Sequence, residues 1–334
     1  MRLTGNDSMM KKLNLHMVDD KQGPQDFYTY LSLKLKDYYA KQIKEYTDNN
    51  SDPEKLSSLK TLMDLPIKRK MIKSAFMVKP YNATVFQVVN YLKEHFEEIK
   101  VNGKIYFVSK DDSNFKLKNK EFYLLANSME VVLFNEHPKL KSIILYLKKI
   151  AEICSTLDIP IVWTAPSGLT INQYYIDSEA IRLKPFSYKN ASYSLSIGSK
   201  KLNKSKQIRA LMPNLIHSLD SSTLALLVNI LFKENKFHNF YSIHDCFAVT
   251  CNNVEKLIYE LKMVYIYVYC DNRYILKFDK GIIENIKLHF GETAFNEKTN
   301  KIIVNNIELD YPNVQEAVYG KIAPNYINSP YLVN

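Results

Sequence analysis

The sequence predicts a helix-rich α+β protein, and three observations lead to this fold class. Long segments place apolar residues three and four positions apart, as on one face of a helix, while shorter segments alternate as strands do. The chain has 334 residues, more than one domain usually contains, so we expect at least two lobes. With 46% hydrophobic and 24% charged residues, it can bury a core and is not a disordered chain.

The first part of the chain predicts four helices. The segment 23–26 opens a long helical pattern that runs out in the polar cluster 48–52. Pro53 then begins a second helix and Pro66 a third, because proline fits the first turn of a helix. Thr84 caps a fourth helix, and its apolar face contains Phe86, Val89, Leu92 and Phe96.

The rest of the chain mixes strands with helices. A turn at Asn102–Gly103 precedes a strand over 104–108. The later elements are helices over about 120–135 and 137–157, a strand over 159–164, an alternating hairpin over 171–197 with its tip at 188–192, a helix over 204–234 interrupted or bent at Pro213, strands over 240–250, and a helix over 254–269.

Composition excludes several classes of protein. Only 8 residues are glycine, and neither GxGxxG nor GxxxxGK[ST] occurs, so a Rossmann fingerprint and a P-loop are absent. Four cysteines without a CxxC pair argue against a disulfide scaffold and a structural zinc site. The apolar run Met263–Cys270 is too short to span a bilayer, and residues 1–12 lack the apolar core of a secretory signal, so we expect no membrane partner.

The net charge of +10 has two explanations. Lys and Arg number 45 against 35 Asp and Glu, which favours a polyanionic partner such as nucleic acid. However, residues with AT-rich codons, such as Lys, Asn, Ile and Tyr, are abundant, which indicates mutational bias in an AT-rich genome. An organelle, or a plasmid within one, has such a genome.

The first candidate site is the run Arg69–Asn82. Arg69, Lys73 and Met77 are four residues apart and share one face of the predicted helix. Tyr81 would lie ~12 Å along the helix axis from Lys73. Two cations and a phenol along one rod can bind a nucleoside triphosphate, and the alternative is a solvated basic face.

The second candidate site is the pair His244–Asp245 between the apolar segments 241–243 and 246–248. A carboxylate in a tight turn between two strands is held rigidly, as a Mg²⁺ ligand must be. The alternative is an ordinary capped hairpin with a His–Asp pair.

The third candidate site is the segment 200–209, which contains no acid and leads into Pro213–Asp220. Its five cations are Lys200, Lys201, Lys204, Lys206 and Arg209. They can contact a nucleic-acid backbone, or they can form the solvated start of a helix.

In this order, these segments resemble the single-subunit, bacteriophage-type DNA-directed RNA polymerases, a family that includes mitochondrial and mitochondrial-plasmid enzymes. Arg69–Asn82 is similar to the family's motif B, R-K-x-x-K-x-x-x-M-x-x-x-Y-G, and Ser242–Phe247 to its motif C, [VI]-H-D-S-F. Pro213–Asp220 resembles P-N-F-[VI]-H-S-x-D, Trp163–Gly168 resembles W-x-T-P-x-G, and Pro324–Asn334 resembles the aromatic C-terminus.

Two details separate this pattern from the related DNA polymerases. Seven residues lie between Lys73 and Tyr81, as in the RNA polymerases, where the DNA polymerases typically have six. Cys246, which follows Asp245, is small like the serine of the RNA polymerases, where the DNA polymerases have a glutamate.

The chain also departs from the family pattern. Asn82 replaces the glycine after the motif B tyrosine, although asparagine tolerates a left-handed backbone, and Pro80 removes one hydrogen bond from the last helical turn. Motif A, which contains the first of two metal-binding aspartates, is absent. Since Leu3–Asn6 is similar to the stretch after motif A, we expect Met1 to fall just downstream of it, with the thumb and the N-terminal domain also missing.

The resemblance implies a right-hand polymerase fold without its thumb and N-terminal domain. Residues 1–25 would end the first palm segment, 26–212 would form the fingers, and 213–334 would form the palm with motif C. The fingers would contain the motif B helix at about 66–81. A hairpin at about 172–198 matches the position of the promoter-specificity loop.

The resemblance also implies a reaction, in which an RNA 3′-hydroxyl attacks the α-phosphate of a nucleotide with the help of two Mg²⁺ ions. Arg69 and Lys73 would neutralise the triphosphate, and Tyr81 would lie near the ribose and help to select ribonucleotides. The remaining implied roles are His217 beside the new base pair, His244 next to the primer end and Asp245 as a Mg²⁺ ligand.

Three hypotheses therefore remain. The chain is a piece of a mitochondrial RNA polymerase that acts on a DNA template, RNA product and NTPs, together with a separate N-terminal part. Alternatively, it is an inactive, nucleic-acid-binding remnant from a plasmid reading frame. A fragment of a family A-like DNA polymerase is disfavoured by the motif B spacing and by Cys246.

Overall fold

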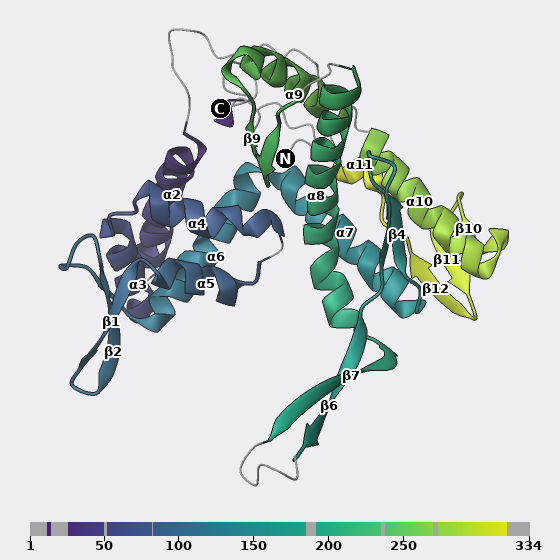
Figure 1. Cartoon of the computed structure of the whole chain (residues 1–334). Helices are drawn as coiled ribbons and strands as arrows, with labels where there is room; N and C mark the ends of the chain where they lie inside the picture. The colour runs from purple at the N-terminus through teal and green to yellow at the C-terminus, as the bar shows by residue number, and fades with distance from the viewer. Residues whose placement is uncertain are drawn as a thin grey trace. The chain divides into compact units, whose positions relative to one another are not determined.

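The computed structural model describes residues 12–14, 26–49, 52–81, 83–184, 192–234, 238–269 and 273–318 (Figure 1). The chain divides into two compact units, and the boundary falls between Ile144 and Leu145. Both units combine helices with small antiparallel sheets, which confirms the predicted helix-rich α+β class. The expected features at Leu3–Asn6, Asn82 and Pro324–Asn334, and the hairpin tip at 188–191, lie outside the described residues.

The first unit contains the four helices predicted for the start of the chain, with the boundaries that the structure gives them. Its elements are α2 (Phe27–Asp48), α3 (Pro53–Asp64), α4 (Arg69–Met77), the 3₁₀ helix η2 (Lys79–Tyr81), α5 (Val85–Lys93), β1 (Phe96–Val101), β2 (Lys104–Ser109), β3 (Lys116–Leu117), α6 (Asn119–Glu136) and the start of α7 (Pro138–Thr156). The Asp26 carboxylate accepts the Tyr28 N–H at the start of α2, and the Asp52 carboxylate accepts the Lys55 N–H in α3. These caps satisfy N–H groups that have no partner within the helix.

The core of the first unit lies between α2, α3, α6 and the β1–β2 hairpin. Its fully buried side chains include Leu31, Leu35, Tyr39, Leu59, Leu62, Phe122 and Leu125. The Phe122 ring lies 4.9 Å from that of Phe96 and 5.2 Å from that of Phe107, edge to face in both cases. The hairpin is therefore attached to α6 through aromatic packing.

Two predictions for this unit were wrong in their boundaries. The helix predicted over 66–81 begins only at Arg69, because Lys68 is extended at φ −76° and ψ 150°, and it ends at Met77. Pro80 has no N–H to donate to the carbonyl of Phe76, and its ring would clash with that carbonyl, so η2 follows instead of another α-helical turn.

The second error concerns Phe96, which the sequence pattern predicts on the helix that Thr84 caps. That helix ends at Lys93, and Phe96 begins β1, which the sequence analysis missed. Asn102 and Gly103 both have positive φ and form the two-residue turn between β1 and β2, with Val101 opposite Lys104. A two-residue turn of this type connects two antiparallel strands. The segment before it therefore pairs with β2 and forms β1.

The second unit contains the end of α7 and the rest of the described chain. Its elements are β4 (Ile161–Thr164), β5 (Thr170–Gln173), β6 (Ile176–Leu183), β7 (Tyr193–Leu202), α8 (Lys204–Asn229), the π-helix η3 (Ile230–Glu234), β8 (Tyr241–Ile243), β9 (Cys246–Ala248), the 3₁₀ helix η4 (Cys251–Asn253), α9 (Val254–Tyr269), α10 (Arg273–Phe290), the 3₁₀ helix η5 (Glu292–Ala294), β10 (Phe295–Asn296), β11 (Lys301–Val304), β12 (Ile307–Asp310) and α11 (Val314–Ala317).

The core of the second unit forms around α8, α10 and β4. The Trp163 ring of β4 lies 6.3 Å from that of Phe278 in α10, and its indole N–H donates to Ser218 Oγ of α8 at 3.1 Å. The hydroxyls of Tyr146 and Tyr311 both donate to the Asp279 carboxylate, which lies on α10. Burial raises the pKa of Asp279, and the two phenols oppose that shift.

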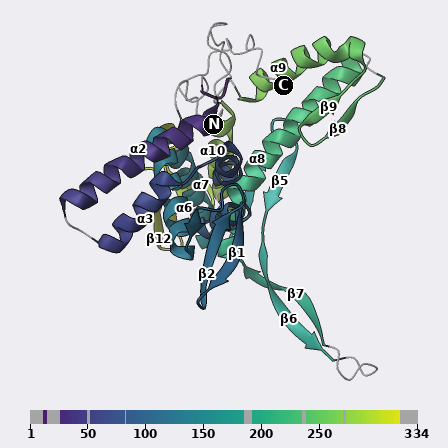
Figure 2. The same ribbon diagram turned by 90° about the vertical axis from the view of Figure 1, so that its left-hand side faces the viewer.

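The hairpin predicted over 172–198 forms, and its strands are β6 and β7. Its predicted start is wrong, because residues 172–173 belong to β5, which pairs with β4. Both views show it projecting from the N-terminal end of α8 (Figure 1 and Figure 2). Ile181 and Leu195 lie opposite each other on one face of the hairpin, and about half of each side chain is exposed.

α8 continues through Pro213, so of the two predicted alternatives at this residue the interruption is wrong and the bend stays a prediction. Together with η3 it forms the single helix of the described residues that is long and apolar enough to cross a membrane, Lys204–Lys233. Length and composition are weak evidence for a membrane span, because a helix in the core of a globular protein passes the same test. Leu211, Leu215 and Leu219 of this helix are buried within the second unit.

Candidate functional site

The motif B helix α4 has one exposed and one buried face. Arg69, Lys73 and Met77 are exposed, which confirms the predicted shared face. The buried side chains on the other side are Met71, Ile72, Ala75 and Phe76. Since α4 ends at Met77, Tyr81 does not continue the same rod but belongs to η2, where it is 36% exposed.

The cations of α4 differ in their partners. Arg69 Nε donates to Asp26 Oδ2 at 2.8 Å, and the guanidinium lies 5.5 Å from the centre of the Tyr28 ring. Partial burial opposes ionisation of Asp26, but hydrogen bonds from Thr29, from the Tyr28 N–H and from Arg69 hold its pKa below the usual range. Lys73 forms no ion pair with any described residue, so its charge is available to an incoming anion.

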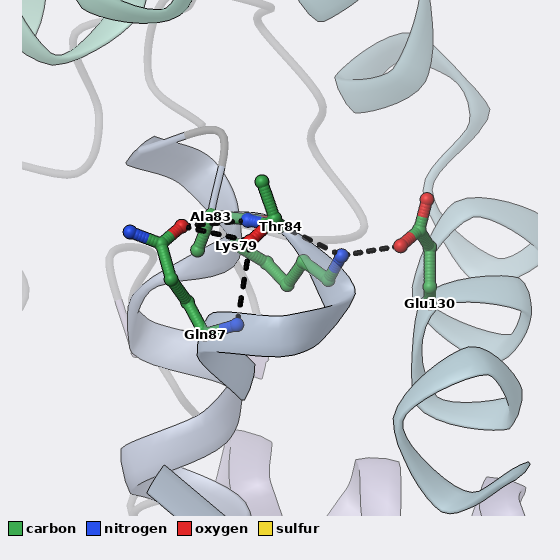
Figure 3. Close-up of polar contacts among 5 residues, drawn as sticks. All are labelled: Lys79, Ala83, Thr84, Gln87 and Glu130. Carbon is green, nitrogen blue, oxygen red and sulfur yellow. Dashed lines mark hydrogen bonds and ion pairs between the residues drawn. The ribbon is translucent and has the colours of Figure 1, made fainter. Parts of the chain in front are cut away.

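The sequence analysis missed an ion pair with a buried lysine, which follows the buried side of α4. Lys79 of η2 is 6% exposed, and its ammonium contacts the Glu130 carboxylate of α6 and donates to the Ala83 carbonyl at 3.3 Å (Figure 3). The sequence contains a local signal for this ion pair. Lys79 follows Ile72 and Phe76 at helical spacing, so it falls on the apolar stripe of the motif, where a lysine needs a partner.

The motif C segment forms the predicted hairpin. β8 and β9 pair with Ile243 opposite Cys246, which leaves His244 and Asp245 as the two turn residues, both exposed. Only His244 has positive φ, at 54°, a conformation that is uncommon outside glycine but enriched in histidine.

Aromatic rings attach this hairpin to the end of α8. Phe247 of β9 stacks on Phe240 at 5.9 Å, and Phe240 packs edge to face against Phe232 of η3 at 6.3 Å. Asp245 thus projects from a short, aromatically anchored turn.

Asp245 does not form a metal centre by itself. Within the described parts of the chain, no group of three or more His, Cys, Asp or Glu side chains could hold a metal ion. The carboxylate is the hard oxygen ligand that Mg²⁺ prefers, so Asp245 fits as one ligand. A complete Mg²⁺ site needs further oxygen ligands, and the described residues do not gather them around Asp245.

The basic segment forms the junction of β7 and α8. Lys200, Lys201, Lys204, Lys206 and Arg209 are all exposed, and none forms an ion pair with a described residue. Asn203 caps α8 by accepting the Lys206 N–H at 2.8 Å, and the Lys206 ammonium lies 4.5 Å from the centre of the Tyr175 ring. Cations at a helix N-terminus add to its positive dipole end, so this junction attracts anions.

The family profile described as "DNA-dependent RNA polymerase" matches residues 2–317 of the chain. The chain belongs to this family. A probable DNA-directed RNA polymerase of Podospora anserina is 37% identical over 315 residues, which are 93% of this chain and 33% of the relative. Another from Neurospora crassa is 26% identical over 350 residues, which are 98% of this chain and 37% of the relative.

The mitochondrial DNA-directed RNA polymerase of Mus musculus is also similar, at 32% identity over 102 residues, 30% of this chain and 8% of the relative. The chain therefore spans about a third of the length of the fungal relatives it matches.

The candidate residues of this polymerase chain fall into two sets. The first unit brings Arg69 and Lys73 onto one helix face and Tyr81 onto the turn that follows. The second unit contains the other set: His244 and Asp245 in the β8–β9 turn, His217 on the exposed side of α8, and the basic segment at the start of that helix.

Proposed function

We propose that this chain carries nucleotide-binding and catalytic segments of a mitochondrial DNA-directed RNA polymerase with a right-hand fold, encoded in an organelle or plasmid genome. The exposed Arg69–Lys73–Met77 face, followed by the exposed Tyr81, is the observation that carries the proposal. It presents cations and a phenol in the order that a ribonucleoside triphosphate requires. The match to mitochondrial polymerases supports the location.

In this proposal, the two cations of α4 act differently. Lys73 makes the first contact with the triphosphate, because no described carboxylate competes for its charge. Arg69 is held by Asp26 and contributes once a phosphate oxygen replaces that carboxylate. Tyr81 lies near the ribose and distinguishes ribonucleotides from deoxyribonucleotides.

Asp245 contributes one Mg²⁺ ligand from the β8–β9 turn, with His244 next to the primer end. A bound Mg²⁺ would stabilise negative charge on the reacting phosphate. His217 lies beside the new base pair, and the basic segment at 200–209 contacts the backbone of the template or product. The β6–β7 hairpin occupies the place of a promoter-specificity loop.

We further propose that activity requires the remainder of a polymerase. The relatives are about three times as long as the region that matches, so most of their length has no counterpart here. The remainder would supply a second carboxylate from motif A, the thumb and a promoter-binding domain.

The test measures templated extension of a primed DNA template with Mg²⁺ and all four NTPs. We expect no product from this chain alone and RNA when the remainder of the polymerase is supplied, either in the same chain or as a separate one. Extension by the chain alone would contradict the need for motif A. Nucleic-acid binding without synthesis in the supplemented reaction would identify an inactive remnant, and a preference for dNTPs would identify a DNA polymerase.

A further inference from the structure

Lys79 is the only buried lysine among the described residues. A lysine ammonium loses much of its hydration in such a position, and only an opposite charge and hydrogen bonds compensate for that loss. The residues two positions before and after it are exposed, since Met77 is 48% and Tyr81 36% accessible to solvent. The chain therefore turns Lys79 inward at the point where it turns Tyr81 outward.

The Lys79 ammonium connects its own turn to the segment that follows and to a helix distant in sequence. It belongs to η2, donates to the carbonyl of Ala83, and forms an ion pair with Glu130 of α6 (Figure 3). The residue after Ala83 is Thr84, whose hydroxyl and N–H exchange hydrogen bonds with Gln87 in the capping box of α5. The ammonium thus links the end of motif B to the first turn of α5 and to α6.

Backbone hydrogen bonds also form a turn at the end of motif B. The Val78 carbonyl accepts the Tyr81 N–H at 3.2 Å and the Ala83 N–H at 3.3 Å. These two hydrogen bonds connect the backbones of Tyr81 and Ala83 to the same carbonyl. The Lys79 ammonium donates to the Ala83 carbonyl and pairs with Glu130, so it links the turn that contains Tyr81 to α6.

We propose that Lys79 and Glu130 are positioning residues for Tyr81, and that the pair sets how strictly the polymerase selects ribonucleotides. The second half of the proposal rests on the proposed role of Tyr81. A site that rejects a substrate for lacking one hydroxyl needs the partner of that hydroxyl in a fixed place. A misplacement of about 1 Å can cost 10²-fold in rate, so a loosened turn changes selection before it changes the fold.

The first experiment needs no enzymatic activity. 3-Fluorotyrosine is placed at position 81 of the full chain, and its ¹⁹F NMR signal is recorded with Lys79→Leu, Glu130→Gln or Lys79→Arg. We expect one narrow resonance in the parent chain, a shifted or broadened one in Lys79→Leu and Glu130→Gln, and a restored one in Lys79→Arg, which keeps the charge. Lys60→Leu is the matched control, because Lys60 is an exposed lysine of the same unit without an ion pair among the described residues.

Glu130→Gln guards against a variant that fails to fold, because Glu130 is partly exposed and glutamine has nearly its shape. Far-UV circular dichroism establishes that each variant remains folded. If the resonance of position 81 is the same in the parent, Lys79→Leu and Glu130→Gln chains, the positioning role is wrong, whatever the chain does in catalysis.

The second experiment measures kcat/KM for an NTP and for the matching dNTP in the polymerase with its remainder supplied. We expect Lys79→Leu and Glu130→Gln to lower the ratio of the two by about tenfold. A purely structural loss would lower both values equally, and that result would overturn the role in selection. If the parent enzyme makes no RNA, the proposed function fails, while the resonance of position 81 still decides the positioning role.

Discussion

The turn that ends motif B and the hairpin that carries motif C are built in opposite ways. Ile72 and Phe76 of α4 are buried, and the turn after that helix is held by the Lys79–Glu130 ion pair. In the motif C hairpin, Tyr241 is 64% and Ile243 55% exposed, and Asp245 lies at the open tip.

This difference indicates where each set of residues obtains its position. The contacts found for Arg69 of α4 and Lys79 of η2 lie within their own unit. Large exposed apolar side chains typically mark surfaces that another protein segment covers. We therefore infer that another protein segment covers the motif C hairpin when the polymerase acts.

The largest expected effect tests the exposed side of this comparison. In the polymerase with its remainder supplied, Asp245→Asn should lower RNA synthesis by several orders of magnitude, because an amide keeps the shape of the side chain but not the charge that holds Mg²⁺. The midpoint of thermal unfolding of the chain should not change, since Asp245 is exposed. Near-normal turnover in this variant would refute the motif C assignment.

The next effect tests the buried side. Ile72→Ala removes a fully buried side chain from α4 and should lower the free energy of unfolding by about 2–5 kcal/mol, measured by urea denaturation. Met77→Ala on the exposed face of the same helix should change it by less than about 0.5 kcal/mol. Equal losses in both variants would mean that α4 is not anchored through this face.

These assignments also show what could be read from the sequence. Asp26 and Asp52 begin helices because their carboxylates satisfy local N–H groups, and such signals are visible within a few residues. The same holds for the turn at His244 and Asp245, with apolar residues on both sides. The exposed face of α4 was predictable because helical periodicity alone places Arg69 and Lys73 together.

What could not be read depends on partners far apart in the chain. Glu130 lies 51 residues after Lys79, so the ion pair is invisible to local patterns. β1 forms because β2 pairs with it and because α6 packs on Phe96, which outweighs the helical spacing of that residue. By contrast, α10 and the β11–β12 hairpin were missed although local signals exist. Four residues of α10 are buried at helical spacing, and Asn305–Asn306 forms the turn between the two strands; the four are Ile275, Phe278, Ile282 and Ile286.

A smaller effect distinguishes the two units by pH. His137 is buried beside Phe27, and neither ring nitrogen has a hydrogen-bond partner among the described residues. Burial, aided by the charge of Lys12, lowers the pKa of His137 from 6.5 to about 4. Below pH 6.5 the unfolded chain binds a proton at His137 that the folded chain does not bind. The free energy of unfolding is therefore highest above pH 6.5 and decreases as the pH falls towards 4.

We expect this loss to reach at most about 3 kcal/mol between pH 6.5 and 4, measured by urea denaturation at several pH values. His137→Leu should remove that part of the slope and keep the stability at pH 7, because the ring nitrogens have no hydrogen bond to lose. Among the described residues the second unit has no buried histidine, so it should not share this effect. A slope that persists unchanged in His137→Leu would assign it to the carboxylates.

The last prediction compares the cations of the two units. Lys68 pairs with Asp111 at 2.9 Å and Lys120 pairs with Glu54, whereas Lys204, Lys206 and Arg209 have no carboxylate partner among the described residues. A paired lysine must give up its carboxylate before it can bind a phosphate, so it releases fewer counterions from DNA. The unpaired cations should therefore dominate the salt dependence of binding.

Fluorescence anisotropy of labelled DNA against salt concentration measures this directly. Replacing Lys204, Lys206 and Arg209 by alanine should flatten the log–log slope by up to ~0.7–0.9 for each phosphate that is no longer neutralised. Replacing Lys68 and Lys120 by alanine should change the slope less per residue. If both sets behave alike, local ion pairs do not decide which cations bind DNA. If neither changes the slope, the cations at the start of α8 form a solvated face or reflect codon bias, and the DNA-binding surface of this chain lies elsewhere.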